Sequence, residues 1–311
     1  MGSNPTPRTI TPPPTFVTDF EAHLRTRLTK RRVPLAESTI IHRVKAIKSL
    51  AKHVNIWDSD AVEKHINDAE WTNGRKEHVS LAYANWCESK GFVYTSRKYL
   101  RQIKLPYVPT EKEIDQLIGG FSDSKYGPFL QLLKETAFRP VEASRLRPMD
   151  FDLERRIVTL NVPAKNSNPR QVKLSSKVIN MINPMICKAK PSARIWKTDS
   201  KNIYESFRRT RDRITKRMGN PNLKRITLKT FRHWKATMEY HRTKDILDVK
   251  DLLGHKNIKN TLVYTHLVSF EEEDAFTVKV ASSIEEFTEL LESGFEYVSD
   301  YEGRKVLRKR K

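Results

Sequence analysis

A proline-containing segment near residue 105 divides this chain of 311 residues into two regions of helical pattern. The segment reads Lys104-Leu105-Pro106-Tyr107-Val108-Pro109. Proline fixes its own φ and disfavours helical backbone in the residue before it, so closely spaced prolines end a helix and favour extended chain. Thr110 and Glu113 then form a capping box, which predicts that a new helix begins directly after the prolines. We therefore expect a domain boundary between residues 105 and 106.

The region before this boundary has the pattern of a small helical domain. Residues 1–15 are proline-rich and are predicted to form a disordered tail. Over residues 16–105, apolar side chains recur at steps of three and four, which is the period of an amphipathic helix. One run, for which Ser38 is the expected N-cap, consists of Ile40, Ile41, Val44, Ile47 and Leu50. The pattern predicts an all-helical domain of about four or five helices.

The region after the boundary, residues 106–268, combines helices with a β-hairpin. Residues 156–162 and 171–174 are rich in strand-forming side chains and flank a turn-like stretch, 163–170, so they predict a hairpin. Helices are expected at 111–118, 176–185, 201–218, 228–240 and 246–253. Gly254 suits the C-terminal cap of the last of these helices. The predicted fold class is therefore mainly α with a small β-hairpin or sheet, an α+β arrangement.

Residues 269–311 are predicted to form a separate C-terminal extension. A strand is expected at 276–280, and Ser283 is placed to cap a following helix. Two more strands are expected at 295–298 and 305–307. This extension ends in a run of arginine and lysine.

The formal net charge of +21 favours a polyanionic partner, with DNA or RNA as the first candidates. The sequence has no apolar run that could span a bilayer and no signal-peptide pattern, so we expect no membrane association. Cys87 and Cys187 lie far apart without metal-ligand spacing, which suits a reducing cytoplasm and predicts no metal site. The sequence also has no glycine-rich phosphate loop, so we expect no ATP-driven mechanism and no cofactor.

Two basic runs in the helical domain predict contacts with DNA phosphates. Such contacts would make affinity fall steeply as salt rises. The candidate residues are Arg25, Arg27, Lys30, Arg31, Arg32, Arg43, Lys45 and Lys48.

The second region carries residues suited to phosphodiester chemistry. Transfer of a phosphodiester between hydroxyls requires stabilisation of negative charge on the non-bridging oxygens. Arginine suits this role because its planar guanidinium donates two parallel hydrogen bonds and stays protonated. Arg139 is followed three residues later by Glu142, which can orient it, and Arg232 shares one helix face with Lys229. Arg139 and Arg232 are therefore the candidate phosphate ligands.

Tyr264 is the candidate nucleophile. A free phenol has a pKa near 10, and neighbouring cations are expected to favour the phenolate. His255, nine residues earlier, is expected to accept the phenolic proton or to donate a hydrogen bond to the phosphate. Lys165, at the hairpin turn, is expected to deliver a proton to the leaving 5′ oxygen. His233 is expected to pack or to orient its neighbours rather than to react.

Taken together, these segments resemble the catalytic domain of the tyrosine recombinases, the phage-integrase family, over residues 110–268. Thr136 to Glu142 matches a Thr-Gly-x-Arg-x-x-Glu pattern, with Ala137 in place of the glycine. Lys165 is the best match to the family's hairpin lysine, ahead of Arg170 and Lys173. The His-x-x-Arg box corresponds to Lys229–Arg232, where lysine replaces histidine. The resemblance implies a catalytic set of Arg139, Lys165, Lys229, Arg232, His255 and Tyr264.

The resemblance also implies a mechanism and a mode of assembly. Residues 16–105 are similar to the family's SAM-like core-binding domain, so the two domains are expected to clamp double-stranded DNA. Tyr264 is expected to form a 3′-phosphotyrosyl bond and to free a 5′ hydroxyl, without ATP or a divalent metal. A homotetramer is expected to act on two duplexes through a Holliday junction. The C-terminal extension is similar to that of archaeal integrase-like members.

Two other functions remain open at this level. A type IB topoisomerase uses the same tyrosine chemistry but religates the same strand. A DNA-binding regulator or architectural protein with an impaired active site would also fit, and the lysine at position 229 keeps this alternative open.

Overall fold

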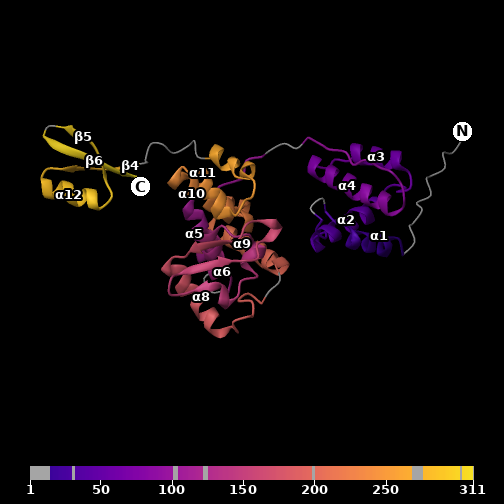
Figure 1. The fold of residues 1–311 in the computed structure, drawn as a ribbon, viewed down its shortest axis with the longest axis horizontal. Helices are drawn as coiled ribbons and strands as arrows, with labels where there is room; N and C mark the ends of the chain where they lie inside the picture. Colours follow the sequence, from indigo (N-terminus) through magenta and orange to yellow (C-terminus); the bar gives the residue numbers. More distant parts are fainter. Residues whose placement is uncertain are drawn as a thin grey trace. The chain divides into compact units, whose positions relative to one another are not determined.

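The computed structural model describes residues 15–29, 32–100, 104–121, 125–197, 200–267, 276–301 and 303–310 (Figure 1). The chain divides into two compact units, and the division falls between Lys104 and Leu105. The described residues are mainly helical, with two small antiparallel sheets. The predicted tail at residues 1–15 lies outside the described residues, apart from Thr15. No helix among the described residues has both the length and the apolar character needed to cross a membrane.

The N-terminal unit is a group of helices around one apolar core. The described helices are α1 (Thr15–Thr26), α2 (Glu37–Leu50), α3 (Ser59–Asp68) and α4 (Asn73–Ser89). The core contains Phe20, Tyr83 and Trp86, all nearly inaccessible to solvent. The predicted apolar run of α2 packs into this core at Ile40, Val44, Ile47 and Leu50, whereas Ile41 is exposed.

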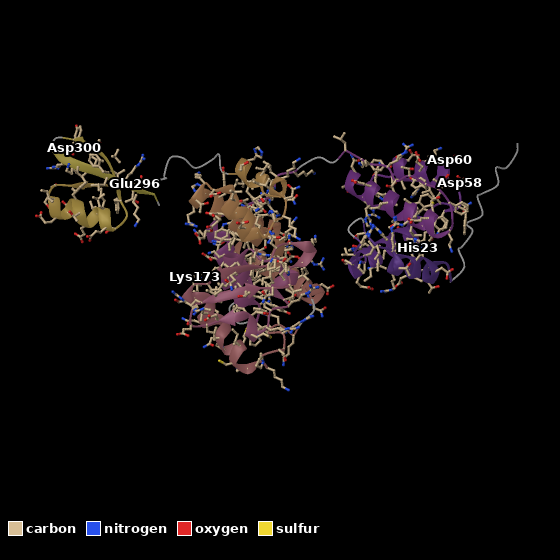
Figure 2. The ribbon with its side chains drawn as sticks, in the orientation of Figure 1. His23, Asp58, Asp60, Lys173, Glu296 and Asp300 are labelled. Atoms are coloured by element: carbon tan, nitrogen blue, oxygen red, sulfur yellow. The ribbon has the colours of Figure 1, made fainter. Side chains whose placement is uncertain are left out.

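Side-chain caps fix where two of these helices begin, with Asp58 at the start of α3 and Thr72 at the start of α4. Asp58 accepts hydrogen bonds from the backbone N–H groups of Asp60 and Ala61 at the start of α3 (Figure 2). The prediction that Ser38 caps α2 is wrong, because the helix begins earlier, at Glu37, after an extended Ala36. Glu37 places a carboxylate in the first turn, where the exposed N–H groups favour negative charge.

The C-terminal unit contains the predicted helices and hairpin. Its helices are α5 (Glu111–Gly119), α6 (Tyr126–Thr136), α7 (Pro140–Ala143), α8 (Ser176–Lys188), α9 (Ser200–Met218), α10 (Leu228–Thr243) and α11 (Ile246–Leu253). The capping box of Thr110 and Glu113 opens α5 as predicted. The large core contains Phe129, Trp196 and Phe231, and α6 and α10 pack against each other.

The predicted hairpin is part of a three-stranded antiparallel sheet. Strands β2 (Ile157–Leu160) and β3 (Arg170–Lys173) pair as expected, with Val158 opposite Val172. Strand β1 (Phe151–Asp152) was not predicted, because two residues are too few to display an alternating pattern. The sheet order is β1-β2-β3, so the β2–β3 loop with Lys165 lies at one end of the hairpin.

The C-terminal extension has its own small sheet and helix. It consists of β4 (Phe276–Ala281), α12 (Ile284–Glu292), β5 (Glu296–Tyr301) and β6 (Arg304–Arg310), with strand order β4-β6-β5. Ser283 caps α12 by accepting a hydrogen bond from the N–H of Glu286, as predicted. Ala281, Leu290 and Leu307 form its buried core, so this segment has the expected strand, helix, strand, strand order.

Candidate active site

A cleft of about 580 Å3 in the C-terminal unit brings together all of the predicted catalytic side chains. The predicted residues that line it are Arg139, Lys165, Lys229, Arg232, His255 and Tyr264. Further lining residues that the sequence reasoning did not assign to catalysis are Pro140, Val141, Tyr204, His233, Asn260 and Val263. Residues more than a hundred positions apart along the chain therefore face one space.

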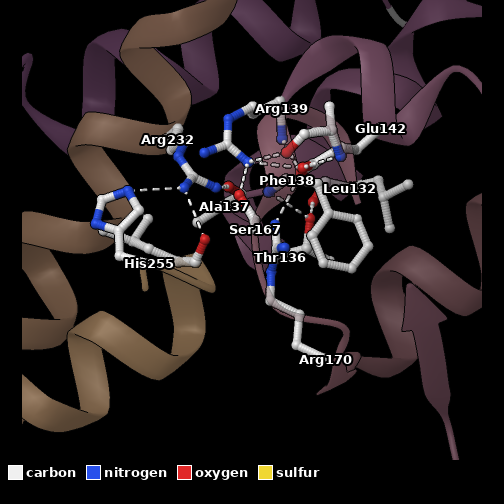
Figure 3. A network of polar contacts seen from close by, with 12 residues as sticks. Leu132, Thr136, Ala137, Phe138, Arg139, Glu142, Ser167, Arg170, Arg232 and His255 are labelled. Carbon is white, nitrogen blue, oxygen red and sulfur yellow. Dashed lines mark hydrogen bonds and ion pairs between the residues drawn. The ribbon is translucent and has the colours of Figure 1, made fainter. Parts of the chain in front are cut away.

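Arg139 stands at the start of α7, where its guanidinium is held in place by two side chains. Its Nη1 donates hydrogen bonds to Glu142 Oε1 and to Ser167 Oγ, both at 2.7 Å (Figure 3). Its backbone N–H also donates to Glu142 Oε2 at 2.9 Å. The predicted orienting role of Glu142 therefore has a direct geometric basis, and Ser167 adds a contact that the sequence did not suggest.

Glu142 is a buried carboxylate that joins α7 to the β2–β3 loop. Besides Arg139, it accepts hydrogen bonds from Arg170 Nη2 at 2.8 Å and from the backbone N–H of Ala164 at 3.0 Å. Burial raises the pKa of Glu142, but the charge of Arg170 and the bonds to Arg139 outweigh burial, so this pKa lies below its ordinary value. The carboxylate is therefore ionised at neutral pH, and it fixes the loop that carries Lys165 beside Arg139.

Arg170 is a functional residue that the sequence reasoning considered only as a weaker substitute for the hairpin lysine. Its side chain is buried, pairs with Glu142 and stacks over the ring of Phe138 at 4.7 Å. The sequence does contain a signal that the side chain of Arg170 faces the protein interior. Arg170 lies two residues before Val172 on β3, so the two share one face of the sheet.

Arg232 ties together the ends of two helices at the floor of the cleft. From α10, its Nη1 donates to the carbonyl of Ala137 at 2.6 Å, and its Nη2 donates to the carbonyl of Leu253 at 2.8 Å (Figure 3). Burial, followed by the charges of Arg139 and Arg170, lowers the pKa of Arg232 to about 9, so it remains a cation at neutral pH.

Ala137 occupies the place of the family glycine and adopts left-handed backbone, with φ of 54°. Glycine normally suits this conformation because a β-carbon strains it. Here the methyl group packs with Ala236, Leu253 and Tyr264 in a small apolar cluster. This packing offsets part of the strain and ties the end of α6 to the segment of the predicted nucleophile.

His255 follows the glycine cap of α11 and has both ring nitrogens occupied. Its Nε2 lies 3.1 Å from Arg232 Nη2, and its Nδ1 lies 2.9 Å from Thr261 Oγ1. A guanidinium only donates, so Nε2 accepts and Nδ1 carries the proton. Burial, then Arg232, Arg139 and Arg170, lower the pKa of His255 to about 4, so the ring is neutral at neutral pH.

Tyr264 lies in a 3-10 helix, Leu262–Leu267, with its side chain almost fully buried. Its hydroxyl lies 3.0 Å from Nδ1 of His233. Burial raises the pKa of Tyr264 and outweighs the lowering effects of Arg232 and Arg139. The neighbouring cations therefore favour the phenolate as expected, but the effect of burial on the pKa of Tyr264 is larger. Among the described residues, the polar partner of the hydroxyl is His233 rather than His255.

Lys165 and Lys229 present ammonium groups to the cleft from two sides. Lys165 has left-handed backbone, with φ of 56°, in the β2–β3 loop, and Lys229 is exposed in the first turn of α10. Neither forms an ion pair with another described residue, so both remain available to an anion in the cleft. Within the described ranges, no group of three or more histidine, cysteine, aspartate or glutamate side chains could hold a metal ion.

The predicted DNA-contacting residues of the N-terminal unit have different environments. Arg25 pairs with Glu21 and Glu37, and Arg27 pairs with Glu88. Burial, then the charge of Arg27, lowers the pKa of Arg43. Arg32, Lys45 and Lys48 are exposed, as is the paired Arg25, whereas Lys30 and Arg31 lie outside the described residues. DNA contact by this set stays a prediction.

Comparisons with known proteins match this chain on both sequence and fold. The model of the phage integrase family matches residues 109–270. A tyrosine recombinase of Thermosipho africanus is 27% identical over 205 residues, which cover 62% of this chain and 71% of that protein. Tyrosine recombinase XerA of Saccharolobus solfataricus, an archaeal relative, is 24% identical over 251 residues, covering 76% and 80%.

Two solved structures share the fold at low sequence identity. The Tn1549 transposon integrase in complex with transposon right end DNA has a TM-score of 0.60 and 13% identity, covering 90% of this chain and 99% of that one. The XerH site-specific recombinase bound to its difH substrate has a TM-score of 0.52 and 16% identity, covering 83% and 93%.

The glycine that caps α11 gives a first prediction. A β-carbon at Gly254 would lie 2.9 Å from Arg170 Nη1 and 2.9 Å from the carbonyl of Asn168, and the backbone φ is +65°. Gly219 has a similar φ, +62°, but open space around it. We expect Gly219→Ala to cost about 1 kcal/mol of unfolding free energy from backbone strain alone. Gly254→Ala should cost about 1–3 kcal/mol more, measured by chemical denaturation. Equal losses of unfolding free energy in the two variants would contradict the close approach of Arg170 and Asn168 to Gly254.

The two neutral histidines predict loss of stability in acid. The folded-state pKa values of His233 and His255, about 4, lie below the ordinary value of 6.5. The contribution of these two neutral rings to the free energy of unfolding is therefore fully present above pH 6.5 and is lost as the pH falls towards 4. We expect the melting temperature to fall over this range, and to fall less in His233→Asn. His266→Gln, which removes an exposed ring, is the control. If the melting temperature of His233→Asn falls with pH as steeply as that of the wild-type protein, His233 does not have the lowered pKa assigned to it.

Proposed function

The chain belongs to the phage integrase family, and the matched residues include the whole cleft, so we propose that it is a site-specific DNA recombinase. In this proposal, Tyr264 attacks a DNA phosphate and forms a 3′-phosphotyrosyl intermediate. The observation that carries the proposal is the convergence of a buried tyrosine, two guanidinium groups and two ammonium groups in one cleft.

The positions of the cationic side chains support distinct roles. Arg139 and Arg232 are held by hydrogen bonds before any substrate arrives, so stabilising negative charge on the non-bridging oxygens requires little reorganisation. Lys165, on the β2–β3 loop, would protonate the leaving 5′ oxygen. Lys229 would donate a further hydrogen bond to the phosphate. His255 would also donate one, as the neutral tautomer that carries its single proton on Nε2 while Nδ1 accepts from the hydroxyl of Thr261.

The energy of the phosphodiester is conserved in the tyrosyl ester, so the proposed reaction needs no ATP. A freed 5′ hydroxyl from a second duplex would then attack the tyrosyl ester and join the strands. This exchange requires a complex of several subunits on two duplexes, and we propose a homotetramer. The Tn1549 integrase structure is a complex with transposon right end DNA and the XerH structure a complex with its difH substrate, which supports duplex DNA as the partner of this chain.

The N-terminal helical unit is proposed to contact DNA beside the catalytic unit. Its exposed basic residues, Arg32, Lys45 and Lys48, would neutralise phosphates without reading bases. The basic runs and the net charge of +21 support this role.

A nicked suicide substrate tests the catalytic proposal. Such a duplex loses a short 5′ fragment after cleavage, so the phosphotyrosyl adduct cannot be resealed. We expect the wild-type protein to form an adduct that survives denaturing electrophoresis, and Tyr264→Phe to form none. No adduct from wild-type protein on a duplex that it binds would favour a DNA-binding regulator.

The two arginines are tested on the same substrate. Arg139→Ala and Arg232→Ala should each slow adduct formation by at least about 100-fold, because each removes a prearranged donor to the phosphate. DNA affinity, measured by gel shift, should change by less than about tenfold. Arg155→Ala replaces an exposed arginine outside the cleft and is the control, with melting temperatures to verify folding. Near wild-type cleavage by either variant would contradict its assignment.

Lys229 is the member of the predicted catalytic set at which the chain departs from the family pattern. If this position needs only a cationic or neutral hydrogen-bond donor, Lys229→His should cleave the suicide substrate within about tenfold of the wild-type rate. Lys229→Met keeps a side chain of similar length without a donor and should be slower than Lys229→His. An inactive Lys229→His would show that the ammonium itself is required at this position.

A further inference from the structure

The hydroxyl of Tyr264 and the ring of His233 form a partly buried pair in the lining of the cleft. His233 follows Arg232 on α10, and its Nδ1 lies 3.0 Å from the tyrosine oxygen. The ring centroids are 5.9 Å apart, with planes inclined by 44°, so the two rings do not stack. We propose that His233 is the catalytic base that accepts the phenolic proton of Tyr264 as this residue attacks DNA. The inference rests on the recombinase proposal and gives a reactive role to a histidine that the sequence predicted only to pack or to orient its neighbours.

The nucleophile needs a base because of its surroundings. Burial holds the pKa of Tyr264 above its ordinary value of 10, so the hydroxyl keeps its proton at neutral pH. Attack by an intact phenol would leave a proton on the new bridging oxygen and make this oxygen strongly acidic. A base in hydrogen-bond contact removes the proton while the bond to phosphorus forms.

Other candidate bases in the cleft are already engaged or carry a positive charge. The nitrogens of His255 contact Arg232 and Thr261. Lys165 and Lys229 face the cleft as ammonium donors, and no carboxylate is among the described residues that line it. The nearby Glu142 is held by Arg139 and Arg170. His233 is therefore the neutral acceptor placed on the nucleophile.

The hydrogen-bond direction agrees with this role. Burial, then the charges of Lys229 and Arg232, lower the pKa of His233 to about 4, so its ring is neutral at neutral pH. A protonated phenol donates to Nδ1, and this requires the ring proton to be on Nε2. In this tautomer the lone pair on Nδ1 points to the hydroxyl that must lose its proton.

The proposal includes a dependence on substrate. A ring whose pKa is about 4 is a weak base while the cleft is empty of DNA. A phosphodiester between Arg139 and Arg232 adds negative charge close to the cations that oppose protonation of His233, so its pKa rises on binding. Negative charge grows further as the tyrosine oxygen approaches phosphorus. The base thus becomes strong enough only when the scissile phosphate is in place.

Each proton that moves has a donor and an acceptor, both in cleavage and in rejoining. In cleavage, the O–H bond of Tyr264 breaks as its oxygen bonds to phosphorus, and the proton moves to Nδ1 of His233. The bond from phosphorus to the 5′ oxygen breaks, and this oxygen takes a proton from Lys165. In rejoining, a 5′ hydroxyl attacks, Lys165 takes its proton, and His233 returns the proton to the departing tyrosine oxygen.

The test measures single-turnover adduct formation by the full-length protein on the suicide substrate from pH 6 to 9. In His233→Asn, the side-chain amide can accept the hydrogen bond of the phenol but cannot take its proton. We expect this variant to be slower than wild type by about 100-fold or more at pH 7. The rate of adduct formation by this variant should rise about tenfold per pH unit as the phenolate forms. A fluorinated, more acidic tyrosine at position 264 should restore the rate of this variant at pH 7. Melting temperatures verify folding, and His233→Gln provides a second variant.

Lys165→Ala is the matched control. This variant should also be slow, but a more acidic tyrosine should not restore it. A substrate with sulfur in place of the 5′ oxygen should restore it instead, because a thiolate leaves without a proton.

Three outcomes overturn the inference. If neither the wild-type protein nor the protein with fluorinated tyrosine at position 264 and an intact His233 forms an adduct, then the recombinase proposal fails and this inference fails with it. If the wild-type protein cleaves and both His233 variants cleave at rates similar to the wild-type rate, the recombinase proposal stands but His233 is not the base. If the His233 variants are slow and neither alkaline pH nor the acidic tyrosine restores them, His233 only positions the tyrosine.

Discussion

The carboxylate of Glu142 is the interaction on which the geometry of the cleft depends. It binds the side chain and the backbone of Arg139, the guanidinium of Arg170 and the N–H of Ala164. A buried carboxylate without these partners would be strongly destabilising, so the arrangement forms as a whole. Because Ala164 and Ser167 belong to the β2–β3 loop, the same network fixes the loop that carries Lys165 relative to Arg139 (Figure 3).

A second set of contacts closes the cleft from the other side. Arg232 bonds to the last turns of α6 and α11 through the carbonyls of Ala137 and Leu253. Burial, and then the positive charges of Arg139 and Arg170, lower the pKa of Arg232, and burial together with the charge of Arg139 also lowers the pKa of Arg170. A bound phosphate relieves the repulsion between these positive charges. The positive charge concentrated in the cleft therefore suits a strongly anionic group.

Much of the fold followed from local pattern. The capping box at Thr110 and the apolar runs predicted most helices, and the hairpin at 156–174 followed from strand propensity. The exceptions have local causes. The cap of α2 was misplaced because several polar residues precede the apolar run, and β1 was missed because it is only two residues long.

The sequence by itself determined the order of helices and strands and the chemical types available for catalysis. Periodicity and capping residues act over a few positions, so they are legible in the chain. Only the tertiary structure decided which of these groups meet. Arg232 bonds to a carbonyl 95 positions earlier, and His233 bonds to a hydroxyl 31 positions later. Such pairings, and the burial that raises the pKa of Tyr264, depend on how α6, α10 and the 3-10 helix of Tyr264 pack, and no local pattern encodes that packing.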